Sequence, residues 1–159
     1  MTPSQARSVH AVVATVAVAA LLLQTALVVS GSSVLAETEV PPLATRLGRL
    51  VSYFTIQSNL LVAVTAVQLA RDPARDGSFW RVVRVAAVVG ITVTGLVHFL
   101  LLRPLLDLEG ANWVADKMLH MVVPVLAVGA WLLAGPRPRA PWRTAITALA
   151  WPVAWLVWT

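Results

Sequence analysis

Cysteine is absent from the 159 residues, which excludes disulfide bonds, thiolate metal ligands and a cysteine nucleophile. Charge is also scarce, because Asp, Glu, Lys and Arg make up 12% of the sequence, against about 25% in an average soluble domain. This shortage indicates lipid rather than water as the solvent. The net charge of +5 comes from basic residues that lie between apolar runs, so nucleic acid is not an expected partner.

The sequence contains several long apolar runs. Each is close to the roughly 20 residues that a helix needs to cross a hydrocarbon core. Inside that core the backbone must satisfy its own hydrogen bonds, and the short alternating strands of a barrel are missing from the sequence. The prediction is one all-α domain, residues 1–159, folded as a polytopic transmembrane helix bundle. Its five predicted helices cover residues 11–30, 50–70, 82–102, 113–134 and 143–159.

The first run has a second interpretation, a secretory signal peptide, because "VLA" before Glu37 resembles a small-residue cleavage site. The apolar core of a signal peptide is typically about 7–15 residues long, and Ala11–Val29 is longer. A retained helix is therefore the favoured interpretation.

The basic residues of the short connections predict the orientation. With the N-terminus in the cytoplasm, the inner side carries Arg7, Arg71, Arg75, Arg81, Arg84, Arg137, Arg139 and Arg143. The outer side then carries Arg46, Arg49, Arg103 and Lys117, with most of the acidic residues, including Glu37. We therefore expect a multi-pass integral membrane protein that has a cytoplasmic N-terminus and membrane lipids as its partners.

Polar side chains of three predicted helices fall at a similar depth. At about 1.5 Å per residue, Thr55 lies roughly 8 Å, His98 roughly 6 Å and His120 roughly 10 Å from the outer boundary. Ionisable groups at depth in a membrane tend to mark function. The sequence therefore predicts a candidate site in the outer third of the bilayer.

Around Thr55, the residues Ser58 and Asn59 share its helix face at spacings i+3 and i+4. Such hydroxyls often bond back to a carbonyl or join helices, which is the alternative interpretation. Gln57 points to another face and is expected to contact a neighbouring helix.

Around His120, Asp116 lies four residues earlier, where its carboxylate could hold one ring nitrogen and fix the tautomer. The alternative interpretation makes Asp116 and Lys117 a solvated pair near the interface.

Two segments, "FTIQSNLLV" (54–62) and "ADKMLHMVVPVLAVGAW" (115–131), resemble the signature segments of the androgen-induced, FAHFA-hydrolase-like membrane proteins. "GLVHFLLLRPL" (95–105) resembles the bacterial six-helix branch of that family. Its animal members are threonine-dependent membrane hydrolases of fatty acid esters of hydroxy fatty acids. The resemblance implies a Thr55 nucleophile, a His120 base, a fatty-ester substrate and a bacterial cell membrane. Relatives continue to a sixth helix, so we expect a truncated chain or one without that helix.

The hydrolase mechanism assigns a role to each candidate. His120 would take the proton of Thr55 during attack on an ester carbonyl and then protonate the leaving alcohol. Asn59 or Ser58 would donate to the oxyanion, and Asp116 would orient His120, with His98 in support. This chemistry needs no metal and no cofactor.

Two other classes of protein stay open. A haem electron carrier could use His98 and His120 as paired axial ligands. A non-catalytic or transporter-like bundle could use the polar face to join helices or line a path. The inner halves of the helices are nearly apolar apart from Thr65 and Gln68, which argues against a path through the membrane.

Overall fold

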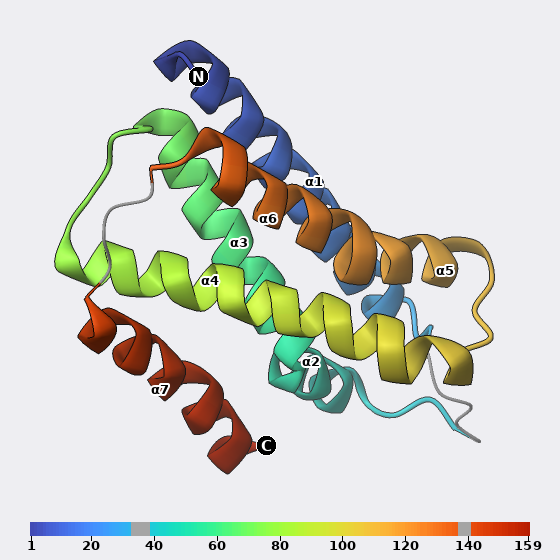
Figure 1. Cartoon of the computed structure of the whole chain (residues 1–159). Coiled ribbons are helices and arrows are strands. Elements are labelled where there is room, and N and C mark those ends of the chain that lie inside the picture. Colours follow the sequence, from blue (N-terminus) through green and yellow to red (C-terminus); the bar gives the residue numbers. More distant parts are fainter. Residues whose placement is uncertain (33–38, 137–140) are drawn as a thin grey trace.

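The computed structural model describes residues 1–32, 39–136 and 141–159. Within these ranges all regular structure is helical (Figure 1). The "VLA" segment with Glu37, and the inner-side residues Arg137 and Arg139, lie outside the described residues.

The main helices are α1 (Pro3–Val29), α2 (Leu43–Ser52), α3 (Phe54–Arg71), α4 (Ser78–Val97), α5 (Gly110–Lys117), α6 (Val123–Ala134) and α7 (Trp142–Trp158). The π turn η1 (His98–Leu102) continues α4, and a 3-10 turn, η2 (Arg103–Leu105), follows it. A second π turn, η3 (Met118–Val122), joins α5 to α6. Within the described ranges, three helical stretches are long and apolar enough to cross a membrane: Pro3–Val29, Ser78–Leu105 and Gly110–Ala134. The bent pair α2 and α3 makes a fourth if it is counted as one span.

The predicted helix over residues 50–70 is wrong at its start. Tyr53 has extended backbone angles, and α2 and α3 meet there at a bend of 68°. Residues 50–52 therefore belong to α2, a separate amphipathic helix that includes Arg46 and Arg49, and α3 begins at Phe54. The break puts Thr55 in the first turn of α3.

Four helices form a ring in which each contacts the next: α1 with α3, α3 with α4, α4 with α6, and α6 with α1. The centre of the ring is built mainly from small side chains, such as Ala17, Ala66 and Ala87. Large apolar side chains, such as Leu22 and Leu132, are exposed on the outside. Small residues let helix backbones approach closely, and a small-residue interior with an apolar exterior is typical of helix bundles in membranes.

Helix α7 lies outside this ring and packs against α4 (Figure 1). The indole nitrogen of Trp151 donates to Oε1 of Gln57 at 3.0 Å, and that of Trp155 donates to the carbonyl of Ser52. Both indole rings also contact Phe54. Gln57 thus joins two helices, as its position in the sequence predicts.

Gly90 permits the close approach of α7 to α4, because a Cβ there would lie 2.6 Å from the ring of Trp151. Gly129 of α6 is a matched control, since a Cβ there would meet nothing within 4 Å. Both Gly→Ala changes gain the same helix propensity, so the difference between them isolates the clash. We expect Gly90→Ala to be less stable than Gly129→Ala by about 1–3 kcal/mol, measured by unfolding in detergent. Equal stabilities would contradict the close packing of α7 against α4 at Gly90.

Candidate active site

Two prolines explain why the helices widen at the candidate histidines. A proline inside a helix has no N–H and its ring clashes with the carbonyl four residues earlier. For Pro124 that carbonyl belongs to His120, inside the π turn η3, and for Pro104 it belongs to Leu100, inside η1. Such π turns occur frequently at functional sites. Each one here holds a candidate histidine, with His98 opening η1.

The two π turns meet because α4 carries a glycine at the crossing. A Cβ on Gly95 would lie 3.1 Å from Pro124 and 3.4 Å from the carbonyl oxygen of His120. The close approach brings the rings of His98 and His120 into a stack, with centroids 4.1 Å apart and planes 16° from parallel.

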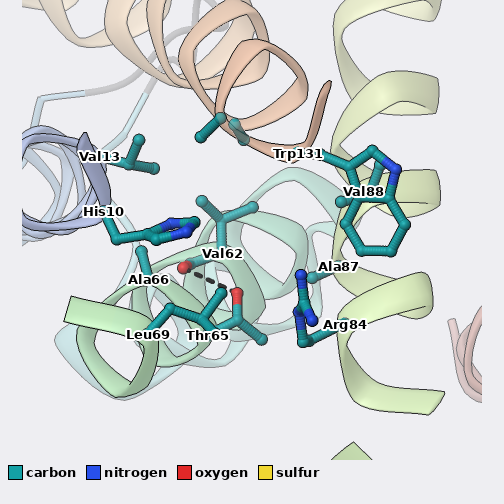
Figure 2. Close-up of a pocket in the computed structure, with 12 residues that line it drawn as sticks. His10, Val13, Val62, Thr65, Ala66, Leu69, Arg84, Ala87, Val88 and Trp131 are labelled. Atoms are coloured by element: carbon teal, nitrogen blue, oxygen red, sulfur yellow. Dashed lines mark hydrogen bonds between the residues drawn. The ribbon is translucent and has the colours of Figure 1, made fainter. Parts of the chain in front are cut away.

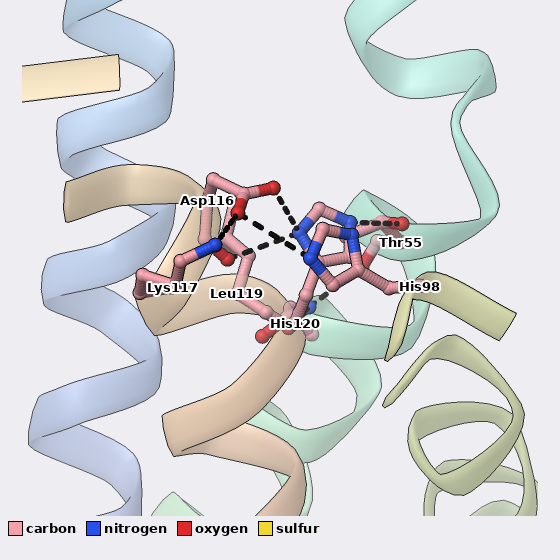
Figure 3. A network of polar contacts seen from close by, with 7 residues as sticks. Thr55, His98, Asp116, Lys117, Leu119 and His120 are labelled. Carbon is pink, nitrogen blue, oxygen red and sulfur yellow. Dashed lines mark hydrogen bonds and ion pairs between the residues drawn. The ribbon is translucent and has the colours of Figure 1, made fainter. Parts of the chain in front are cut away.

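Thr55 and His120 face each other across α3 and η3 (Figure 3). Oγ1 of Thr55 lies 3.1 Å from Nε2 of His120. On the other side of the ring, Nδ1 lies 3.0 Å from the carbonyl oxygen of Asp116 and 3.1 Å from its carboxylate Oδ1. Both of these partners can only accept, so Nδ1 must carry the proton of the neutral ring. Nε2 is then bare and accepts the Thr55 hydroxyl.

Asp116 is the centre of the cluster and is buried. Its Oδ2 lies 2.9 Å from Nζ of Lys117 and 3.4 Å from Nε2 of His98. The carboxylate therefore contacts His120 and Lys117 together, rather than forming only the solvated pair with Lys117. His98 is 1% exposed, and neither of its ring nitrogens makes an aligned hydrogen bond within the described residues. The 3.4 Å separation is within ion-pair range, but its direction is poor for a hydrogen bond.

Asn59 holds α3 against η3 and is not free for catalysis. Its amide nitrogen donates to the carbonyl oxygens of Thr55, at 2.8 Å, and Leu119, at 3.2 Å. Both amide protons are used, so Asn59 has none left for an oxyanion. Ser58 is fully buried, and a Cβ on Gly90 would lie 3.2 Å from its hydroxyl, which places Ser58 toward α4.

The break at Tyr53 supplies other donors beside Thr55. The first N–H groups of a helix have no helical acceptor. In α3 the N–H groups of Ile56 and Gln57 donate to the carbonyl of Tyr53. The N–H groups of Phe54 and Thr55 belong to the first two residues of α3, at the end of the helix where the dipole favours negative charge.

A second polar cluster lies at the other end of the bundle, and the sequence did not single it out. His10 and Arg84 line a small cavity there (Figure 2), whose volume is about 30 Å³. Nε2 of His10 lies 3.0 Å from the carbonyl oxygen of Gly135, and Nη2 of Arg84 donates to that of Pro136 at 2.6 Å. The guanidinium also lies over the ring of Trp131. These contacts bind the carbonyls that follow α6, where cations are favoured.

The chain matches no protein-family model, no curated protein and no solved structure.

The two histidines His10 and His120 are expected to adopt opposite tautomers. Nε2 of His10 faces a carbonyl and carries the proton, whereas Nδ1 of His120 faces two acceptors. At a pH where both rings are neutral, ¹⁵N NMR of histidine-labelled protein should give Nε2–H for His10 and Nδ1–H for His120. Assignment would use His10→Gln and His98→Gln. An Nε2–H tautomer at His120 would contradict its availability as a base.

Proposed function

We propose that the protein is a threonine-dependent hydrolase of lipid esters, with Thr55 as nucleophile and His120 as general base. The observation that carries the proposal is the hydrogen-bonded series from Thr55 through His120 to Asp116, with contacts of 3.1 Å on each side of the ring. A hydroxyl next to an oriented base is the arrangement that activates a weak nucleophile. Thr55 and His120 are both partly exposed, so a substrate can reach them.

The reaction follows from these contacts. As Oγ1 of Thr55 attacks the ester carbonyl, its proton passes to Nε2 of His120, and the negative charge of Asp116 stabilises the imidazolium that forms. The imidazolium then protonates the leaving alcohol and leaves an ester on Thr55. Water enters, gives a proton to Nε2 and attacks this ester, which releases the fatty acid and restores the hydroxyl.

The N-terminus of α3 is the proposed oxyanion site. Asn59 has no free amide proton and Ser58 is fully buried, so we assign the oxyanion to the N–H groups of Phe54 and Thr55 instead. One donor of this kind is typically worth about 2.7–4 kcal/mol of transition-state stabilisation.

The membrane setting supports a lipid substrate. Several helices are long and apolar enough to cross a bilayer, and the basic residues of the connections favour a cytoplasmic N-terminus. The site would then lie toward the outer face, where an ester near the headgroups meets water. The resemblance of residues 54–62 and 115–131 to the FAHFA-hydrolase-like proteins supports fatty acid esters of hydroxy fatty acids as the substrate class. The resemblance of residues 95–105 to the bacterial branch supports a bacterial plasma membrane.

The rival functions have weaker support. Axial haem ligands approach an iron from opposite faces of a porphyrin, whereas the rings of His98 and His120 stack directly on each other with centroids 4.1 Å apart. A transport path would need continuous polar surface, but at the other end of the bundle His10 and Arg84 are engaged with carbonyls. A non-catalytic bundle does not account for a bare imidazole nitrogen that faces a hydroxyl.

Removal of either partner should abolish hydrolysis. We expect Thr55→Ala and His120→Ala to lower the rate of long-chain ester cleavage by at least about 10³-fold, because nucleophile and base act as one unit. Thr65→Val is the matched control on the same helix, since the Thr65 hydroxyl only bonds back to Leu61 and Val62. A fluorophosphonate probe should label Thr55 and not the buried Ser58.

Folding of each variant would be checked by size-exclusion chromatography in detergent. Ester cleavage that persists at the wild-type rate in folded Thr55→Ala would overturn the mechanism. A wild-type protein that takes no probe and cleaves no ester would favour the non-catalytic bundle.

A further inference from the structure

The atoms around Asp116 have the composition of a metal site. His98, Asp116 and His120 each offer one ligand atom, and these atoms lie within 4.8 Å of one another. The carboxylate is 3.4 Å from Nε2 of His98 and 3.1 Å from Nδ1 of His120. Bonds of about 2.0–2.1 Å in a tetrahedron place neighbouring ligand atoms about 3.4 Å apart. An imidazole binds a metal in the plane of its own ring, and the rings of His98 and His120 are stacked with planes 16° from parallel. To enclose an ion, the ring of His98 must therefore turn out of this stack.

His98 supplies a second, independent observation. Buried polar groups are nearly always hydrogen-bonded, yet both nitrogens of this 1% exposed ring lack an aligned partner within the described residues. Its Nε2 lies 3.4 Å from the carboxylate of Asp116 (Figure 3). A cation between the two would satisfy this nitrogen.

A cavity of about 220 Å³ provides access to the cluster. Its lining includes His98, Asp116, Lys117 and Arg103. It is large enough to admit a hydrated ion and to hold water as a fourth ligand.

We infer that His98, Asp116 and His120 bind a divalent transition-metal ion of the zinc type. Two imidazoles and one carboxylate, with one position open to water, suit Zn²⁺ and exclude Mg²⁺, which prefers oxygen ligands. The hydrolase mechanism predicted from the sequence needs no metal, so this inference departs from that expectation.

The metal would oppose the hydrolase, and this consequence rests on the proposed function. Nδ1 of His120 must lose its proton to bind the ion, and the neutral ring then carries its proton on Nε2. The proton moves from one ring nitrogen to the other through solvent, with no net release. Nε2–H donates to Thr55 instead of accepting from it, so the base is lost. Zinc is thus an inhibitor of ester cleavage and not its catalyst.

The test uses the full chain in detergent, stripped of metal with EDTA and dialysed against Zn²⁺ or Mg²⁺. We expect one zinc ion per chain, no stoichiometric magnesium, and visible absorption bands typical of tetrahedral coordination with Co²⁺. His98→Gln should weaken zinc binding by at least about 10-fold. Loss of a residue that only hydrogen-bonds a metal ligand already lowers metal affinity by about that much, and loss of a ligand should lower it further. His10→Gln, which removes a buried imidazole at the other end of the bundle, should bind zinc like wild type.

Lys117→Met separates this site from a merely structural cluster. The ammonium of Lys117 competes for Oδ2 of Asp116 at 2.9 Å, so its removal should tighten zinc binding at least about fivefold. Equal zinc affinity in wild type, His98→Gln and Lys117→Met would overturn the inference, as would the absence of stoichiometric binding. Stoichiometric zinc in a protein that cleaves no ester would keep the metal site and reject the hydrolase. Ester cleavage unaffected by bound zinc would reject the inhibitory link.

Discussion

The hydrogen bond from Nδ1 of His120 to Asp116 is the interaction on which the site depends. Hydrogen-bonding groups are scarce in an apolar bundle, so a ring nitrogen there takes its protonation state from the few neighbours that it has. Because Asp116 offers a carbonyl and a carboxylate oxygen to the same nitrogen, the proton stays on that side. The consequence appears on the other side of the ring, where Thr55 meets a bare nitrogen. The carboxylate thus acts on a hydroxyl that it does not touch.

Irregular backbone is what brings these groups together. A straight helix over residues 50–70 would bury Thr55 in a regular turn, whereas the bend at Tyr53 places it at a helix N-terminus. Likewise, Pro124 and the π turn at His120 free the ring to reach across to α3. Each distortion costs regular hydrogen bonds, and Asn59 offsets part of that cost by binding the carbonyls of Thr55 and Leu119.

Much of this arrangement could be predicted from the sequence, because apolar length and depth are linear properties. The all-helical bundle and the similar depth of His98 and His120 follow from counting residues at a constant rise. The count for Thr55 began at Leu50, before the bend, so its agreement with them does not rest on a continuous helix. The bend at Tyr53 could not be predicted from the sequence, since residues 50–56 contain no proline or glycine. The prolines after His98 and His120 were a usable signal for the π turns. The partners of Asn59, and the contacts of His10 and Arg84, depend on helix rotation and packing, which periodicity alone does not determine.

Asp116 also explains how one cluster can have two states. A buried carboxylate needs a cationic partner, because an unpaired charge in low dielectric is very costly. Lys117 fills that role at 2.9 Å through a flexible side chain that is about one quarter exposed. A partner on a flexible stem can move into the adjoining cavity, which leaves Oδ2 for another cation. His120 donates to the carboxylate through Nδ1, the nitrogen that a metal would bind. Exchange of the cation at Asp116 therefore changes the tautomer of His120 and decides whether the nitrogen that faces Thr55 carries a proton. His120 is a base when Lys117 neutralises the carboxylate of Asp116, and a metal ligand when a metal ion does.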